Sequence, residues 1–179
     1  SCDVSTVVGL RDRAFLEFLY ATGARISEVA SLKLEQVDLQ NGTVRLFGKG
    51  SKERIVPLYE SAIEWLKKYL SSSRPTLLLK DKAGRAHSAL FISVRGNTMS
   101  ADSLRKVFSS YLTAAGLDSS LSPHAMRHTY ATELLGGGAD LRIVQELLGH
   151  ESLSTTQVYT HLSVDRLKEA AKAAHPRSK

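Results

Sequence analysis

The chain has 179 residues, of which 42% are hydrophobic, and this is enough for one globular domain with a buried core. No stretch approaches 18 consecutive apolar residues and the first residues lack the pattern of a signal peptide, which excludes a membrane-spanning helix and favours the cytoplasm. The formal net charge is +6, and the single cysteine, Cys2, excludes an intrachain disulfide framework and a zinc site built from cysteines.

The basic surplus indicates a polyanionic partner. Lysine and arginine displace counterions from phosphates, so a net charge of +6 suits nucleic acid. A membrane surface is less favoured, because the sequence has no basic amphipathic segment with exposed aromatic side chains.

The first part of the chain predicts two helices. Residues 1–9 read as a linker or a truncated end. A helix then follows from apolar and small residues at helical spacing, ended by Gly23: Phe15, Phe18, Leu19 and Thr22. Ser27 is expected to cap a short second helix.

The spacing of the hydrophobic residues then changes from one typical of a helix to one typical of a strand. Residues 43–47 and 54–58 are predicted to be strands joined by a hairpin loop over 48–52, and a short third strand is expected around 37–39. A helix follows over 62–70, and the polar run at 71–75 predicts a loop.

The second half reads as helical. One apolar stripe ends at Gly116 and consists of Leu104, Val107, Phe108, Tyr111, Leu112 and Ala115. Ser122 and Pro123 are expected to open a helix that runs through Leu134, and Asp140 to cap another that ends at Gly149. A short helix is expected over 155–161. The last helix, about 164–174, has an apolar face made of Val164, Leu167, Ala170, Ala171 and Ala174. The predicted fold class is mostly α with a small three-stranded antiparallel sheet.

Several motifs carry groups suited to phosphodiester chemistry. Arg25 lies between two predicted helices, and Lys49 lies in the Gly-rich hairpin. His124 and Arg127 are three residues apart and share a helix face. His150 follows Gly149, and Tyr159 comes nine residues later. No carboxylates cluster as a two-metal site requires, so charge neutralisation is expected from Arg, Lys or His, without a metal or another cofactor.

In this order, these motifs resemble the tyrosine recombinase (phage integrase) family, in particular its Xer-type site-specific recombinases. The resemblance runs from about Gly9 to Arg177. It implies a catalytic domain related to type IB topoisomerases over residues 10–179, with a catalytic set composed of Arg25, Lys49, His124, Arg127, His150 and Tyr159.

The resemblance also implies a reaction. Tyr159 attacks phosphorus to give a 3′-phosphotyrosine, Arg25 and Arg127 hold the non-bridging oxygens, and Lys49 protonates the leaving 5′ oxygen. His124 assists proton transfer and His150 hydrogen-bonds the phosphate. The implied biological role is resolution of chromosome dimers on double-stranded DNA.

The family pattern also bears on partners. Family members carry an N-terminal core-binding domain that this sequence is expected to lack. They act as homo- or hetero-tetramers on DNA, and the resemblance implies that the 164–174 helix exchanges between subunits. Two departures from the family pattern, Met126 for leucine and Glu133 for histidine, lie outside the catalytic set.

Other interpretations stay open. Within the enzyme class, the alternative is an integrase of a phage or mobile element. Residues 140–161 also resemble a helix-turn-helix, as in a non-catalytic DNA-binding regulator. An inert paralogue is a third alternative.

Structural readings compete with the functional ones. His124 and His128 have the i, i+4 spacing of zinc ligands, although Ala125 stands where a zinc protease has glutamate. Singly, each candidate residue is more simply explained as structural. Lys52, Glu53 and Arg54 read as a solvated hairpin face or as backbone contacts. Three further tyrosines are expected to be structural: Tyr20, Tyr69 and Tyr111.

Overall fold

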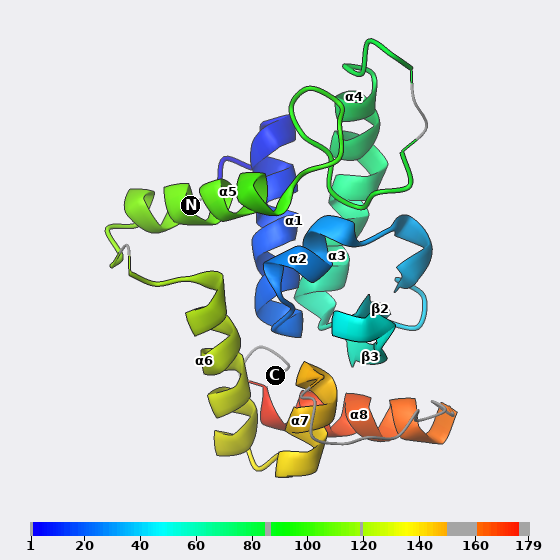
Figure 1. Ribbon diagram of the computed structural model, residues 1–179, viewed down its shortest axis with the longest axis vertical. Helices are drawn as coiled ribbons and strands as arrows, with labels where there is room; N and C mark the ends of the chain where they lie inside the picture. Colours follow the sequence, from blue (N-terminus) through cyan, green and yellow to red (C-terminus); the bar gives the residue numbers. More distant parts are fainter. Residues whose placement is uncertain (1, 85–86, 119, 150–160, 176–179) are drawn as a thin grey trace.

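Helices make up most of the chain, as the hydrophobic periodicity predicts. The computed structural model (Figure 1) describes residues 2–84, 87–118, 120–149 and 161–175. Its α-helices are α1 (Val7–Thr22), α2 (Ile26–Ser31), α3 (Glu60–Lys68), α4 (Arg74–Leu78), α5 (Ala101–Ala114), α6 (Pro123–Gly136), α7 (Leu141–Leu148) and α8 (His161–Ala174). The strands are β1 (Val37–Asp38), β2 (Thr43–Phe47) and β3 (Glu53–Pro57), and the short helical turns are η1 (Leu34–Gln36), η2 (Lys49–Ser51) and η3 (Tyr69–Ser73).

The three strands form one antiparallel sheet in the order β1-β2-β3, which confirms the predicted fold class. Val44 pairs with Val56, and Leu46 pairs with Arg54. All four of these residues are buried, because alternate residues of a strand point to the same face. The register therefore places Arg54 on the inward face of the sheet.

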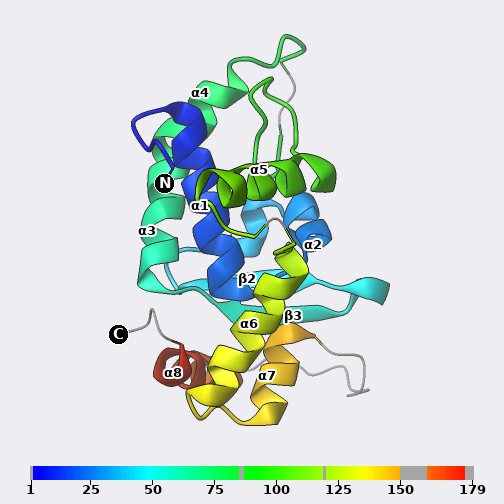
Figure 2. The same cartoon turned by 90° about the vertical axis from the view of Figure 1, so that its left-hand side faces the viewer.

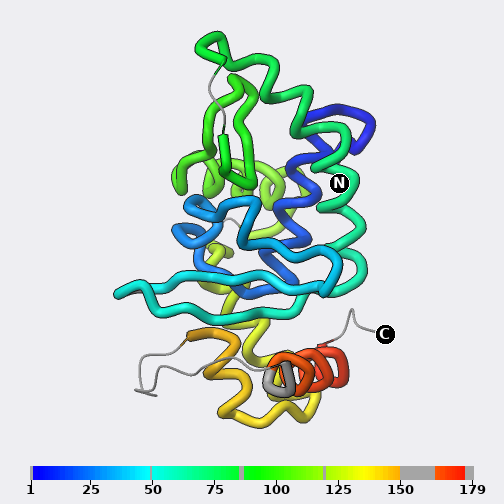
Figure 3. The backbone as a smooth tube through the Cα atoms, turned by 90° about the vertical axis from the view of Figure 1, so that its right-hand side faces the viewer, coloured from blue at the N-terminus to red at the C-terminus, as the bar shows by residue number. Residues whose placement is uncertain are grey.

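The sheet lies between two groups of helices. Figure 2 shows α1, α2 and α3 on one side of β2 and β3 and the pair α7 and α8 on the other, while α6 runs alongside both groups. Figure 3 shows the β2–β3 hairpin projecting from the body between these two groups. The core on the α1 side contains Ala14, Phe15, Phe18 and Leu19, all of which are buried.

Two predicted helix starts are wrong by a few residues. α1 begins at Val7, because the Thr6 hydroxyl accepts from the Gly9 N–H at 3.0 Å and caps the helix; residues 7–9 are therefore helical and not part of a linker. Ser27 lies inside α2 and does not cap it. The residue before α2 is Arg25, whose backbone N–H donates to Glu28 instead.

The loop predicted at residues 71–75 is also wrong. The chain continues from α3 through the π-helical turn η3 directly into α4. The Ser73 hydroxyl donates to the Val7 carbonyl at 2.6 Å, and the Arg74 guanidinium donates to the Ala89 carbonyl at 2.7 Å. Pro75 stands near the start of α4, directly after the π-helical turn η3, and it removes one backbone N–H donor from this continuous helical stretch. Tertiary hydrogen bonds therefore outweigh the local preference of a serine run for a loop.

The predicted caps of the second half are confirmed. The Ser122 hydroxyl accepts from the Ala125 N–H at 3.1 Å, and an Asp140 carboxylate oxygen accepts from the Arg142 N–H at 2.7 Å. Gly149 ends α7 in the left-handed conformation, with φ 64°. The predicted short helix over 155–161 falls on residues 155–160, which lie outside the described residues.

The last helix packs against its own domain. Leu167, Ala171 and Ala174 are buried, and α8 contacts β3, α6 and α7. Its predicted apolar face is therefore covered by the same chain. Among the described helices, none combines the length and the apolarity needed to cross a bilayer.

A leucine pair tests the core. Leu66 of α3 is fully buried, whereas Leu79 is 87% exposed. We expect Leu66→Ala to lower the free energy of unfolding by about 2–5 kcal/mol, because it removes buried methyl groups and leaves a cavity. Leu79→Ala should change it by less than about 0.5 kcal/mol. Urea unfolding followed by circular dichroism measures both, and equal effects of the two changes would contradict the assigned core.

Candidate active site

Arg25 stands at the junction of the first two helices. Gly23 ends α1 in the left-handed conformation, with φ 56°, and Arg25 immediately precedes α2. The Arg25 N–H donates to Glu28 Oε2 at 2.7 Å, and its Nη1 lies 3.3 Å from Glu28 Oε1. The Arg25 side chain is still 43% exposed. It is thus oriented by Glu28 and remains accessible to a ligand.

Arg127 ties α6 to the ends of two other helices. Its Nη1 donates to the Gly23 carbonyl at 2.6 Å, and its Nη2 donates to the Leu148 carbonyl. Burial, followed by the charges of Arg25 and Arg54, lowers the pKa of Arg127 to about 10. Arg127 therefore stays cationic at neutral pH. These bonds use two of its five N–H donors, which leaves others for an anion.

Arg54 is a third cation of the same cluster, and its predicted place on a solvated hairpin face is wrong. Its side chain is 3% exposed. Nη1 and Nη2 donate to the two oxygens of Glu28 at 2.7 and 2.8 Å, and Nε donates to the Leu147 carbonyl at 2.8 Å. The inward register of β3 explains this burial, and the fork of donors explains how the buried charge is satisfied.

Glu28 pairs with Arg25 and Arg54, and Arg127 lies close enough for the charges of all three to shift its pKa. We call these four residues the arginine cluster: Arg25, Arg54, Arg127 and Glu28. Burial raises the pKa of Glu28, but the hydrogen bonds and charge of Arg54 outweigh this effect and hold the pKa below its ordinary value. Glu28 is therefore a carboxylate at neutral pH. Three cations and one anion leave the cluster with excess positive charge, which suits a phosphate group.

The β2–β3 hairpin approaches this cluster. A Cβ placed on Gly48 would lie 3.6 Å from Glu28 Oε1 and 3.9 Å from Arg25 Nη1. Lys49 follows directly and begins the turn η2, in which Gly50 has a φ of 72°. The backbone thus brings the position of Lys49 next to Arg25, although the Lys49 side chain lies outside the described part of the structure.

His124 lies one helical turn before Arg127 on α6, and its side chain is exposed. His128, one turn further along, is exposed as well. Within the described ranges, no three His, Cys, Asp or Glu side chains gather as a metal site requires. His124 and Arg127 both lie on α6, and because the His124 imidazole is exposed it is accessible to a substrate.

His150 and Tyr159 lie outside the described residues. The chain approaches them from the end of α7, where a Cβ on Gly149 would lie 3.1 Å from Arg54 Cδ. Gly149, the last described residue before them, therefore packs directly on Arg54 of the arginine cluster.

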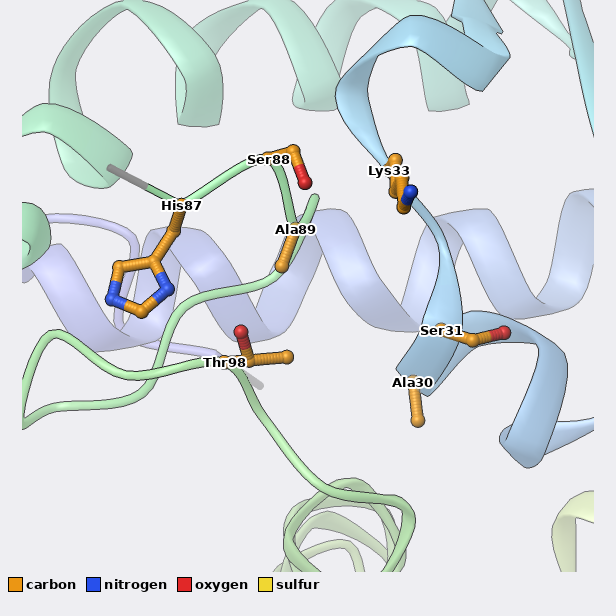
Figure 4. A pocket seen from close by; sticks show the side chains of 7 residues that line it. All are labelled: Ala30, Ser31, Lys33, His87, Ser88, Ala89 and Thr98. Carbon is orange, nitrogen blue, oxygen red and sulfur yellow. The ribbon is translucent and has the colours of Figure 1, made fainter. Parts of the chain in front are cut away.

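A separate shallow pocket of about 250 Å³ lies between the end of α2 and the loop that precedes α5 (Figure 4). It is lined by Ala30, Ser31, Lys33, His87, Ser88, Ala89 and Thr98. None of these residues belongs to the arginine cluster or to the predicted site, so the pocket does not form part of the candidate active site.

Comparison with known proteins decides the family. The sequence profile of the Phage integrase family matches residues 3–166. The chain belongs to the phage integrase family.

The relatives of this phage integrase family member include Xer-type recombinases. The chain is 50% identical to tyrosine recombinase XerD of Pseudomonas aeruginosa over 98% of its length and 57% of the relative. It is 47% identical to tyrosine recombinase XerC of Pelotomaculum thermopropionicum over 99% of its length and 58% of the relative. The chain thus spans somewhat under three fifths of these relatives.

A solved structure agrees with the fold. The XerH site-specific recombinase bound to its difH substrate, in a pre-cleavage complex, superposes with a TM-score of 0.70 and 34% sequence identity. The match covers 93% of this chain and 47% of the XerH chain. The fold of the chain is therefore that of the catalytic domain of this family.

Sequence reasoning named Arg25 and Arg127 of the arginine cluster but missed Glu28 and Arg54. Two signals could have found them. Glu28 stands three residues after Arg25, which is the spacing of a capping box. Arg54 is two residues before Val56 in β3, so strand alternation places both on one face.

The pH dependence of stability tests the role of Glu28. Its pKa is lower in the folded state, so its contribution to stability is complete above the ordinary pKa of 4.5 and is lost as the pH falls through the folded value. We expect Glu28→Gln to destabilise the protein by about 3–5 kcal/mol at pH 7, because Arg54 stays buried without its partner. The difference from the unmodified protein should shrink below about pH 4.

A matched control is Glu64→Gln, since Glu64 pairs with Lys68 on the surface, where its side chain is 60% exposed. Urea unfolding of the three proteins between pH 7 and pH 3 gives the comparison. The assigned role of Glu28 is wrong if its substitution costs no more than that of Glu64.

Proposed function

We propose that this chain is the catalytic domain of a site-specific recombinase that cuts and rejoins DNA through a 3′-phosphotyrosine intermediate. The observation that carries the proposal is the arginine cluster. Arg25 and Arg127 come from distant parts of the sequence, and they lie in one cluster with excess positive charge in a chain of the phage integrase family. A phosphodiester fits such a cluster, because its non-bridging oxygens gain charge stabilisation as phosphorus is attacked.

Six residues have separate roles in the proposed reaction. The Tyr159 oxygen attacks phosphorus, a bond from tyrosine to phosphorus forms, and the bond from phosphorus to the 5′ oxygen breaks. Arg25 and Arg127 hold the non-bridging oxygens. His124 assists the transfer of the tyrosine proton, and His150 donates a hydrogen bond to the phosphate. Lys49 is the sixth residue and acts at the leaving group.

We assign to Lys49 the role of proton donor to the leaving 5′ oxygen. The support for this assignment is the position of Gly48 beside Glu28 and Arg25, which brings the hairpin to the place where the phosphate binds. A flexible ammonium group on a glycine-flanked turn can reach an oxygen on the side of the phosphate opposite the nucleophile.

The chemistry conserves the energy of the phosphodiester. The new bond from tyrosine to phosphorus replaces the bond to the 5′ oxygen, so the 3′-phosphotyrosine is still a phosphodiester. A 5′-hydroxyl of a second strand can attack it and regenerate both DNA and tyrosine. The proposed reaction therefore needs no ATP. It uses no cofactor, because the arginines supply the charge neutralisation.

The proposed biological role is chromosome dimer resolution. Its support is the similarity to XerD and XerC, 50% and 47% identical, over nearly the whole chain. The substrate is then double-stranded chromosomal DNA in the cytoplasm.

The active assembly is proposed to be a tetramer of identical or paired recombinases on two DNA duplexes. In the described chain α8 covers its own β3, α6 and α7. We propose that the same surface accepts the tail helix of a neighbouring subunit when the tetramer forms.

Covalent capture tests the nucleophile. Suicide duplexes with a nick beside the cleavage position, carrying the recombination sites of the Xer relatives, should become joined to the chain through the 3′ phosphate. Tyr159→Phe should bind these duplexes and form no adduct, while Tyr111→Phe should still form one. The Tyr111 hydroxyl donates to Asp12 at 3.1 Å, which explains its structural role.

Denaturing gels followed by mass spectrometry of the cross-linked peptide measure the adduct. A chelator should leave its yield unchanged. An adduct formed by the Tyr159→Phe variant would refute the assignment of the nucleophile. DNA binding without an adduct from the unmodified chain would favour a non-catalytic DNA-binding regulator.

Sulfur substitution tests the proton donor. Lys49→Ala should cleave ordinary DNA about 100- to 10,000-fold more slowly, because general acid catalysis is lost. DNA with sulfur at the bridging 5′ position should restore this rate, since a thiolate leaves without protonation. The same DNA should rescue Arg25→Ala and Arg127→Ala much less, because these residues stabilise the phosphate. Lys52→Ala is the matched control from the same hairpin. Equal rescue of all variants would remove Lys49 from the acid role.

A further inference from the structure

The end of α8 inserts a histidine among three tyrosines. His175 is 1% exposed, and its ring stacks on Tyr59 with centroids 4.1 Å apart and planes at 28°. Tyr20 meets it edge-on at 5.0 Å, and Tyr130 lies 5.7 Å away. These side chains come from α1, α6, α8 and the segment after β3. We call them the aromatic cluster: Tyr20, Tyr59, Tyr130 and His175.

A second contact, between Gly137 and Ala174, fixes the position of the C-terminal tail against α6. A Cβ placed on Gly137 would lie 2.1 Å from the Ala174 carbonyl oxygen and 2.5 Å from its Cα. The φ of Gly137 is −79°, a value that any residue can adopt, so glycine is required here because a Cβ would collide with Ala174. The His175 N–H also donates to the Ala171 carbonyl at 2.9 Å, which extends the helical hydrogen bonding to His175. The backbone of the tail therefore lies directly on the end of α6.

The aromatic cluster is in contact with the backbone that holds the two site arginines. A Cβ on Gly23 would lie 2.6 Å from Tyr130 Cδ1, so the Tyr130 ring packs directly against the chain at Gly23. The Gly23 carbonyl accepts from Arg127 Nη1 at 2.6 Å, and Arg25 follows two residues later. Tyr130 thus touches both His175 and the turn between α1 and α2.

We propose that His175 is a positioning residue for the arginine cluster. By filling the space beside Tyr130, it presses this ring against Gly23, and the Gly23 carbonyl in turn orients Arg127. Interiors are close-packed, so a void next to a ring is transmitted to the ring's other neighbours. The consequence for catalysis rests on the proposed function, whereas the positional coupling does not.

Arginine side-chain NMR of the free 179-residue chain tests this coupling without DNA. In His175→Ala, the guanidinium N–H groups of Arg127 should exchange with solvent about tenfold faster, because the Gly23 carbonyl is less well held. His175→Phe should restore slow exchange, since a ring of similar shape fills the space. Glu169→Ala, an exposed position on the same helix, should leave exchange unchanged.

Arg74 is the internal reference. Its guanidinium also donates to backbone carbonyls, those of His87 and Ala89 at 2.7 Å, but at the opposite end of the domain. General destabilisation would accelerate both arginines, whereas the proposal requires acceleration at Arg127 alone. Unchanged exchange at Arg127, or equal acceleration at Arg74, overturns the proposal.

A second variant covers the case in which His175→Ala does not fold. Gly137→Ala displaces the tail backbone from α6 and leaves His175 itself intact. It should accelerate exchange at Arg127 in the same way, and slow exchange in this variant overturns the proposal. Because no DNA is present, failure to cleave DNA in a separate assay would count against the proposed function and not against this coupling.

Discussion

The buried ion pair between Glu28 and Arg54 is the interaction on which the rest of the site depends. Each charge alone would be very costly to bury, and the pair is stable only because both carboxylate oxygens and three guanidinium nitrogens are satisfied. The pair connects α2 to β3, and the third bond, to the Leu147 carbonyl, adds α7. Three segments that are distant in sequence are thereby held at fixed positions around one carboxylate.

The remaining cations gain their function from this arrangement. Glu28 is shared by Arg54 and Arg25, and it therefore neutralises neither completely. Arg127 is fixed by backbone carbonyls, which carry no net charge. The result is a rigid site with surplus positive charge. Such a site stabilises an anion without having to reorganise, and this is the condition for strong electrostatic catalysis of phosphoryl transfer.

The C-terminal tail meets the last turn of α1 close to this site. Tyr20 of α1 and His175 after α8 belong to one aromatic cluster, and Tyr130 of α6 links that cluster to Gly23. A tail helix that only covered apolar surface would not need such contacts. The packing thus connects the tail, through Tyr130 and Gly23, to the carbonyl that accepts from Arg127.

The sequence by itself determined the approximate positions of most helices, the hairpin, the caps at Ser122 and Asp140 and the order of the candidate residues. These features depend on contacts between residues two to four positions apart, which a local pattern records. Only the tertiary structure decided that residues 71–75 are helical and that Arg54 pairs with Glu28. A Lys-Glu-Arg run in a hairpin is normally solvated, and no residue near Arg54 in the sequence indicates which carboxylate it pairs with. The partner, Glu28, lies 26 residues away and is brought to Arg54 by the folding of α2 onto the sheet, so the choice between solvent and ion pair is made by packing.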